Sequence, residues 1–396
     1  MVYPNIFELT SQTIALKKLI RITTVPSSLR TLLKGQQRFM SQYFEVIGVA
    51  SKGEPLYEVE INEGIRTYAI NMTRSISPFK DLKSLYKLYK FLKKEKPFIV
   101  HTHTPKAGTL GMMAAKLAGV PHRIHTIAGM PLLETKGFKR RILNSVERIT
   151  YRCATLVLPN SFGLYKVIID QNFTKPDKLR VIGNGSSNGI DVDHYDPQLV
   201  PDTIKKDLRS DLNISESDTV FIFIGRMVTD KGVNELVAAF DQLSRSNNTS
   251  ILILVGPRED TLDPLTDSTE TIIKENPKIK FVGVQMDIRP YVAISDVLVH
   301  PSYREGFPNV VLQGSCMGLP CIVSDINGCN EIISQNINGL IVPVKSAEKL
   351  HEAMSYVLNH PEEIKRMASN TRSNIESKYK RELIWEELLK LYQGLE

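Results

Sequence analysis

Short, strongly apolar and β-branched runs recur along the chain and alternate with segments whose apolar residues have helical spacing. Such alternation predicts parallel strands joined by helices, because a parallel pair needs a crossover connection that covers a face of the sheet. Thirteen runs are predicted as strands: 20–25, 44–50, 65–70, 98–101, 123–126, 155–159, 179–182, 219–225, 250–256, 279–283, 296–301, 320–325 and 339–343. Thirteen strands are too many for one ordinary open sheet, so we predict an α/β fold with two doubly wound, Rossmann-like domains.

A polar stretch over 191–218 has almost no strand signal and is punctuated by prolines. This composition places the predicted domain joint near 197–201, in a chain of 396 residues whose length suits two domains. We therefore expect an N-terminal domain over 1–198 and a C-terminal domain over 199–379.

Composition excludes several classes of protein. With 42% hydrophobic and 23% charged residues the chain is neither disordered nor a coiled coil. No apolar run approaches the ~20 residues that span a bilayer, and Lys17 and Lys18 interrupt the apolar core that a signal peptide needs. The four cysteines form no C-x-x-C pair, which argues against a structural zinc site and a disulfide framework. We expect a cytoplasmic protein.

The two halves of the chain differ in charge. Residues 1–198 contain 29 Lys and Arg against 15 Asp and Glu, a net charge of +14, whereas residues 199–396 contain 21 against 28, a net charge of −7. A basic half joined to an acidic half predicts that the first meets an anionic partner, which is a nucleic acid, a membrane surface or a phosphorylated substrate.

Two basic amphipathic stretches, 80–96 and 136–152, lie in the basic half. In the first, seven lysines surround an apolar stripe at helical spacing made of Leu82, Leu85, Tyr89 and Leu92. These stretches are either surface helices with solvated lysines or helices that rest against anionic lipid headgroups. The two interpretations are compatible, since the stripe can face the sheet while the lysines face lipid.

Several motifs in the first half do not predict a binding site. The glycines of 183–189 lack the spacing of a dinucleotide fingerprint and no helix follows them, so a turn is the better interpretation. His101 and His103 point to opposite sides of a strand, which argues against a shared metal ion. Neither a P-loop lysine, a nucleophile elbow nor an aromatic-basic nucleic-acid motif is found.

The second half is more informative, because predicted strand 219–224 runs into Gly225 and Arg226, and Lys231 follows just before a helix-like segment. A glycine at a strand end permits close backbone approach, and two cations beside a helix N-terminus suit a diphosphate. The alternative is two surface cations in a loop.

A similar arrangement follows predicted strand 296–301, where Glu305 and Gly306 precede a helix start. The carboxylate can accept hydrogen bonds from hydroxyl groups, and the amides after it can hold phosphate. Gln313 is eight residues after Glu305, just over two helical turns, so it is expected to line the same wall. Both motifs lie at strand carboxyl ends, where open α/β sheets bind ligands.

Together, GRMVTDKG at 225–232, SYREGFPNVVLQG at 302–314 and NGIDVDHYDP at 188–197 resemble the retaining family 4 glycosyltransferases of the GT-B fold. Within that family the sequence is most similar to bacterial enzymes that build capsule, O-antigen and other surface polysaccharides. The resemblance runs from about residue 20 to the C-terminus. It implies two Rossmann-like domains that face a cleft, with segment 380–396 returning to the N-terminal domain.

The resemblance also implies roles at matching positions. Arg226 and Lys231 hold the donor diphosphate, and Glu305 binds hydroxyls of the transferred sugar. Gln313 replaces the family's second glutamate, and its neutral amide can still hydrogen-bond ribose. Other donor contacts are implied at Gly225, Val284, Gly306, Phe307, Pro308 and Asn309.

In the basic half, His125 of RIHTIAG matches the family histidine that faces the donor sugar, and it completes the predicted catalytic set with Arg226, Lys231 and Glu305. His103 is a weaker candidate on the acceptor side. A core or loop histidine is the alternative for each. Where many relatives carry a Gly-Gly turn after the first strand, this chain has Ser27 and Ser28, which either contact the acceptor or cap the following helix.

The resulting hypothesis is a retaining hexosyltransferase that moves a sugar from a nucleotide-sugar donor, UDP-linked, to a lipid-pyrophosphate-linked glycan. The implied partners are that donor, that acceptor and an anionic membrane surface, without nucleic acid, at the cytoplasmic face of the membrane. No cofactor or metal ion is expected, because the two cations neutralise the diphosphate. The alternatives are a nucleotide-sugar 2-epimerase on the same fold and a non-catalytic module that binds membrane or nucleic acid.

Overall fold

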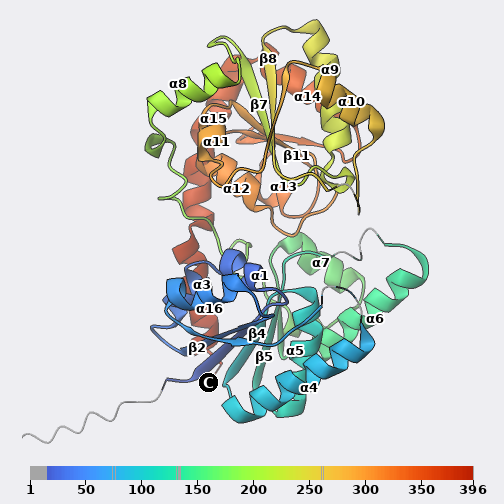
Figure 1. Ribbon diagram of the computed structural model, residues 1–396, viewed down its shortest axis with the longest axis vertical. Helices are drawn as coiled ribbons and strands as arrows, with labels where there is room; N and C mark the ends of the chain where they lie inside the picture. Colours follow the sequence, from blue (N-terminus) through green and yellow to red (C-terminus); the bar gives the residue numbers. More distant parts are fainter. Residues whose placement is uncertain are drawn as a thin grey trace, which may run out of the picture. The chain divides into compact units, whose positions relative to one another are not determined.

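The computed structural model describes residues 16–395 except 74, 76, 131, 133, 134, 260 and 262, and it contains two six-stranded sheets (Figure 1). Every strand pair with a described register is parallel. The first sheet has the order β3-β2-β1-β4-β5-β6 and the second β12-β11-β10-β7-β8-β9. The α/β fold with two Rossmann-like sheets is therefore confirmed.

The first sheet is made of β1 (Lys18–Ile22), β2 (Glu45–Ala50), β3 (Arg66–Ala69), β4 (Ile99–Thr102), β5 (His122–Ile127) and β6 (Leu156–Pro159). Its accompanying helices are α1 (Pro26–Leu32), α2 (Gln36–Met40), α3 (Glu54–Glu63), α4 (Pro78–Glu95), α5 (Pro105–Ala118), α6 (Gly137–Cys153) and α7 (Phe162–Asp170).

The second sheet is made of β7 (Thr219–Ile224), β8 (Ser250–Val255), β9 (Ile279–Gly283), β10 (Val297–His300), β11 (Cys321–Ser324) and β12 (Gly339–Val342). Its helices are α8 (Asp202–Asp211), α9 (Val233–Ser246), α10 (Asp267–Glu275), α11 (Arg289–Ala293), α12 (Asn309–Cys316), α13 (Cys329–Ile332), α14 (Ala347–Asn359) and α15 (Pro361–Tyr379). The last helix is α16 (Arg381–Gln393).

Contacts group the chain into two compact units, one with the residues up to Thr102 and Lys106–Ile124, the other with His103–Pro105 and the residues from His125 onward. Within the second unit, α16 is attached to the segment around Asn188, because the Trp385 indole donates a hydrogen bond to the Asn188 Oδ1 atom at 2.7 Å. The domain boundary at 198/199 and the return of 380–396 to the N-terminal domain stay predictions.

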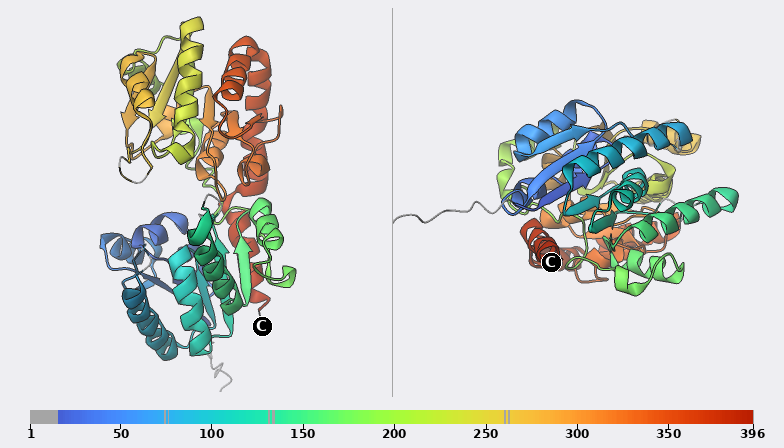
Figure 2. Two further views of the ribbon diagram at one scale, coloured as in Figure 1. Left: turned by 90° about the vertical axis from the view of Figure 1, so that its right-hand side faces the viewer. Right: turned by 90° about the horizontal axis from the view of Figure 1, so that it is seen from below.

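The core of the second sheet is built by alternation along buried strands. Val220 and Ile222 of β7 pack into one apolar cluster with α12 and α15, whereas Phe221 and Phe223 pack into another with α9 and α14. Successive side chains of a strand point to opposite faces, so a nearly continuous apolar run is what a sheet covered on both faces requires. Figure 2 shows the helical layers from two further directions.

Twelve of the thirteen predicted strands are present, with ends that differ from the prediction by no more than three residues. The prediction for 179–182 is wrong, because Leu179 makes only an isolated bridge to Val157. The chain then enters the turn predicted at 183–189, where Gly183 and Gly185 have positive φ angles of 52° and 103°. Because the turn begins at Gly183, too few residues follow Leu179 to form a strand.

The apolar stripe predicted for 80–96 is also corrected by the structure. Helix α4 buries Ser84, Leu88, Phe91 and Leu92. Leu82, which the prediction placed toward the sheet, is 66% exposed. The buried face is centred on Leu88, so Leu82 lies away from it, whereas Leu85 and Tyr89 lie at its edge and are partly buried.

Gly256, just after β8, provides a test of the close packing at the carboxyl end of the second sheet. Its φ is +141°, and a Cβ atom there would lie 1.8 Å from the Gly225 carbonyl oxygen. We expect Gly256→Ala to lower the free energy of unfolding by more than about 3 kcal/mol, since both strain and overlap oppose it. Chemical denaturation measures this.

Gly119→Ala is the matched control, because Gly119 also has a positive φ of +77° but no atom within 4 Å of the added Cβ. The expected loss is about 1–2 kcal/mol, from backbone strain alone. Equal losses in the two variants would contradict the close contact between the ends of β7 and β8.

Candidate functional site

A polar pocket of about 120 Å³ lies at the carboxyl ends of β7 and β10. These two strands are neighbours in the sheet although β8 and β9 lie between them in the sequence, so the chain connections leave them in opposite directions. Ligands of open α/β sheets bind at such a switch point. The pocket is lined by Ala128, Gly129, Met130, Arg226, Asp230, Lys231, Arg304, Glu305 and Gly306.

The close approach of the β7 loop to β10 depends on Gly232. The loop forms a 3₁₀ turn, η4 (Thr229–Lys231), and Gly232 follows with φ +70° as the residue before α9. A Cβ atom at Gly232 would lie 2.1 Å from the Pro301 carbonyl oxygen. Only glycine therefore lets this loop lie against the end of β10, which brings Lys231 to Glu305.

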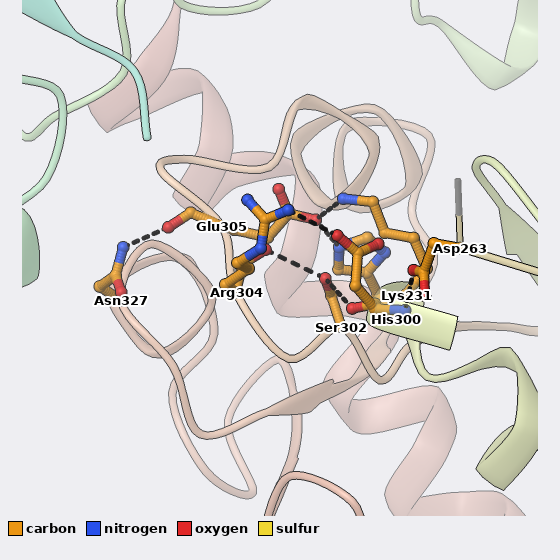
Figure 3. Close-up of polar contacts among 8 residues, drawn as sticks. Lys231, Asp263, His300, Ser302, Arg304, Glu305 and Asn327 are labelled. Atoms are coloured by element: carbon orange, nitrogen blue, oxygen red, sulfur yellow. Dashed lines mark hydrogen bonds and ion pairs between the residues drawn. The ribbon is translucent and has the colours of Figure 1, made fainter. Parts of the chain in front are cut away.

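Glu305 is the electrostatic centre of the pocket (Figure 3). Its Oε1 atom accepts a hydrogen bond from the Lys231 ammonium and another from His300 Nε2 at 2.9 Å. Burial by itself raises the pKa of Glu305, but the hydrogen bonds and the electrostatic attraction from His300 and Lys231 outweigh it and lower the pKa from 4.5 to about 2. Glu305 is therefore a carboxylate at any physiological pH.

A second group of polar contacts holds the loops around this carboxylate. Arg304 forms an ion pair with Asp230 at 2.7 Å, and the Asp230 amide donates to Asp263 Oδ2 at 2.8 Å. On the other side, the Asn327 side-chain amide donates to the Glu305 backbone carbonyl. Figure 3 shows these side chains arranged around Glu305. The loops after β7, β10 and β11 are thus tied together by side chains.

Arg226 is engaged differently from Lys231. Its side chain is 47% exposed, and its guanidinium forms an ion pair with Glu259, in the loop after β8. The pocket thus has two cations: Lys231 is shared with the buried Glu305, and Arg226 pairs with a partly exposed carboxylate. A surface pair of this kind contributes little stability, so an anionic ligand of higher charge can replace Glu259.

Of the other donor-side candidates, Gly306 lines this pocket and the rest lie outside its lining. Gly306 is close to the segment after β5, because a Cβ atom there would lie 1.9 Å from the Ala128 carbonyl oxygen. Val284 is 64% exposed just after β9, and Phe307 is buried. Gly225 follows β7, Pro308 precedes α12, and Asn309 is the first residue of that helix.

Gln313 does not line the pocket with Glu305. The expectation rested on helical spacing, but α12 begins only at Asn309, so Glu305 lies in the preceding loop. The Gln313 amide instead donates to the Tyr195 hydroxyl at 2.8 Å. Burial and then Asp287 raise the pKa of Tyr195 to about 12, so this hydroxyl keeps its proton.

The candidates from the first half lie outside the pocket lining. His125 is buried in β5, with its ring 6.3 Å from that of Tyr151, and His103 is buried just after β4. Ser27 and Ser28 lie in the first turn of α1, whose N-terminal cap is Val25, with Pro26 next. The suggestion that these serines cap the helix is therefore wrong, because the proline starts the helix one residue earlier.

Sequence reasoning did not identify four residues of the site, His300, Asp230, Asp263 and Arg304. His300 is the last residue of β10, beside the motif that predicted Glu305. A histidine at the carboxyl end of a buried strand is a signal that could have been used. Asp230 and Asp263 gave no comparable signal in the sequence, because the residues that they contact lie in other loops.

Two family models match the chain. The model for glycosyl transferases group 1 matches residues 204–374, and the model for the glycosyl transferase 4-like domain matches residues 37–185. The chain is 32% identical over 379 residues to the capsular polysaccharide biosynthesis glycosyltransferase CapM of Staphylococcus aureus, covering 95% of this chain and 97% of CapM. The chain belongs to the family 4 glycosyltransferases of the GT-B fold.

Another relative of this glycosyltransferase is the UDP-Gal:alpha-D-GlcNAc-diphosphoundecaprenol alpha-1,3-galactosyltransferase of Escherichia coli, which is 30% identical over 88% of this chain and 90% of its own length. The solved structure of Anabaena Alr3699/HepE in complex with UDP has a TM-score of 0.78 at 17% identity, covering 95% of this chain and 100% of that one. The prediction of an enzyme, a hexosyltransferase, is confirmed. In the part of this glycosyltransferase that the structure describes, no helix has the length and apolar character to cross a membrane.

The low pKa of Glu305 predicts a pH-dependent contribution to stability. A carboxyl whose pKa is lower in the folded than in the unfolded chain stabilises the fold above about pH 4.5, and this contribution is lost as pH falls toward the folded value. We expect the stability difference between wild type and Glu305→Gln to be constant above about pH 6 and to shrink from about pH 5 to pH 3. Denaturant titrations at a series of pH values measure it.

Glu352→Gln is the control, because Glu352 pairs with Lys349 on an exposed helix surface. Its stability difference is expected to stay within about 0.5 kcal/mol at every pH. A difference for Glu305→Gln that stays constant down to about pH 3 contradicts the low pKa.

Proposed function

We propose that this glycosyltransferase transfers a hexose from a UDP-linked donor to a lipid-pyrophosphate-linked glycan in surface polysaccharide synthesis, with retention of configuration at the sugar carbon. The observation that carries the proposal is the convergence of Arg226, Lys231 and Glu305 on one pocket at the switch point of the second sheet. Two cations in this pocket suit a diphosphate, and the carboxylate suits sugar hydroxyls.

The relatives support the choice of donor and acceptor. The Escherichia coli enzyme is named for a UDP-galactose donor and a diphosphoundecaprenol-linked acceptor, and CapM is named for capsular polysaccharide biosynthesis. HepE was crystallised with UDP. A pyrophosphate on a lipid also explains why the first half of the chain carries a net charge of +14.

The chemistry follows from the state of Glu305. A general base needs a pKa near the working pH, and a carboxylate with a pKa of about 2 is too weak a base to take a proton from the acceptor hydroxyl. Glu305 therefore holds the donor sugar through its hydroxyls. The departing diphosphate, stabilised by Arg226 and Lys231, takes the acceptor proton on the same face of the sugar, which retains its configuration.

The same two cations make a metal ion unnecessary for neutralising the diphosphate. We expect turnover to be unchanged within about twofold by a chelator, since Arg226 and Lys231 supply the charge that a divalent ion provides elsewhere. His125 completes the proposed catalytic set, and Gln313 and Val284 complete the donor contacts.

Replacing either cation tests the site. We expect Lys231→Ala and Arg226→Ala each to lower turnover by at least ~100-fold, because each removes charge stabilisation of the leaving diphosphate. The assay follows nucleoside diphosphate release from a panel of nucleotide sugars in the presence of lipid-linked acceptor extracted from bacterial membranes.

Lys349→Ala is the control for the cations, since Lys349 forms an exposed ion pair with Glu352 in α14, and it should keep turnover within about twofold. Full activity of both pocket variants contradicts the site. Donor conversion without acceptor supports the epimerase alternative, and absence of donor binding supports the non-catalytic one.

We also propose that α4 rests on the anionic inner face of the cell membrane, where lipid-linked acceptors are found. Phe79, Leu82 and Tyr86 lie along one stripe of α4 and are 92%, 66% and 58% exposed. Lysines flank the stripe at Lys80, Lys83, Lys87 and Lys90. An amphipathic helix with apolar side chains among lysines suits the boundary between headgroups and acyl chains.

Substituting the stripe tests this contact. The triple variant Phe79→Ser, Leu82→Ser, Tyr86→Ser is expected to bind vesicles of phosphatidylglycerol and phosphatidylcholine at least ~10-fold more weakly than wild type, because three apolar contacts are lost. Sedimentation with vesicles measures the affinity, and pure phosphatidylcholine vesicles should bind neither protein.

The double variant Tyr57→Ser, Ile61→Ser is the control, since these residues are 67% and 62% exposed on α3, which carries acidic residues. Its vesicle binding should equal that of wild type. Equal binding of the α4 variant and wild type contradicts membrane contact through this stripe.

A further inference from the structure

His300 occupies an unusual position for a core residue. It ends β10, its side chain is 3% exposed, and its ring is parallel to that of Phe223 within 14°. Nε2 is bonded to Glu305, but Nδ1 is buried and has no hydrogen-bond partner among the described residues. A buried nitrogen without a partner costs free energy that an apolar side chain avoids, so packing alone does not explain a histidine here.

The contact with Glu305 fixes which nitrogen carries hydrogen. Because Glu305 is a carboxylate, it only accepts hydrogen bonds, so Nε2 is the donor. The Oε1 atom of Glu305 thus receives donors from two elements, Lys231 from the loop after β7 and His300 from β10. None of the described residues donates to Oε2, which leaves that oxygen for a ligand in the pocket.

Lys231 and His300 differ in what a donor diphosphate does to them. A lysine ammonium sits on a rotatable four-carbon stem and is the group that a phosphate attracts, whereas the His300 ring is buried beside that of Phe223. When Lys231 turns toward the diphosphate, His300 is the donor that keeps Glu305 in place.

We infer that His300 is a positioning residue that holds the Glu305 carboxylate so that Oε2 faces the hydroxyls of the transferred sugar. The part of this inference that concerns the sugar rests on the proposed function. The contact between His300 and Glu305 does not, because the structure shows it directly. His300 is not among the residues that line the pocket, so we expect its loss to affect the sugar-dependent step and to leave nucleotide binding intact.

The experiment compares His300→Leu with His300→Gln, whose side-chain amide offers an N–H where Nε2 stood. For His300→Leu we expect affinity for UDP within about twofold of wild type and turnover of the UDP-sugar at least ~10-fold lower, as for a lost hydrogen bond to a charged group. His300→Gln should recover most of that turnover. Calorimetry with UDP and the diphosphate-release assay with UDP-galactose or UDP-glucose give the two readouts.

A third readout needs no substrate. The free energies of unfolding of His300→Leu, Glu305→Gln and the double variant form a cycle, and contact between the side chains predicts that the two effects are not additive. Non-additivity without turnover of any nucleotide sugar supports the contact and refutes the proposed function instead.

Additive effects in the cycle overturn the inference. It is also overturned if both His300 variants lose UDP affinity and turnover in parallel, because that result describes a residue needed only for folding. Wild-type turnover in His300→Leu also overturns the inference, because Glu305 then works without the hydrogen bond from His300.

Discussion

The reversal of strand order between β7 and β10 is the constraint on which the site depends. Chain connections leave these neighbouring strands in opposite directions, and such a reversal opens a crevice beyond the carboxyl ends of the strands. The two loops that begin there contain the lysine, the arginine and the glutamate of the pocket. Gly232 and the contacts of Asp230 bring those loops together, so one rule of sheet topology determines where the charges meet.

The pocket is electrostatically prepared before a ligand arrives. A buried carboxylate is unfavourable by itself, and Glu305 remains ionised only because Lys231 and His300 donate to it. This arrangement keeps a hydrogen-bond acceptor for hydroxyl groups beside a cation for phosphate, because Glu305 accepts from Lys231 through Oε1 alone. Groups held this way need little rearrangement when charge develops on a leaving group, which is the usual source of rate enhancement in transfer reactions.

Sequence reasoning predicted the elements that depend on local pattern and short motifs. β7 and β8 were predictable because their apolar runs are long, and Arg226, Lys231 and Glu305 were predictable because each follows a strand end. The reasoning was wrong where the result depended on where an element starts. Gln313 was expected on the same wall as Glu305 from helical spacing, but α12 begins only at Asn309, so this spacing does not apply to Glu305. Leu82 was assigned to the buried face of α4, but the helix turns Phe91 inward instead.

The ion pair between Arg226 and Glu259 also affects which anions this pocket selects. The Arg226 guanidinium already has a negatively charged neighbour on the chain, so an incoming anion competes with Glu259 rather than meeting an unpaired charge. A weakly charged molecule gains too little from that exchange, whereas a diphosphate that also reaches Lys231 gains contacts with both cations. Glu259 thus acts as an internal competitor, which a diphosphate displaces more readily than a singly charged anion does.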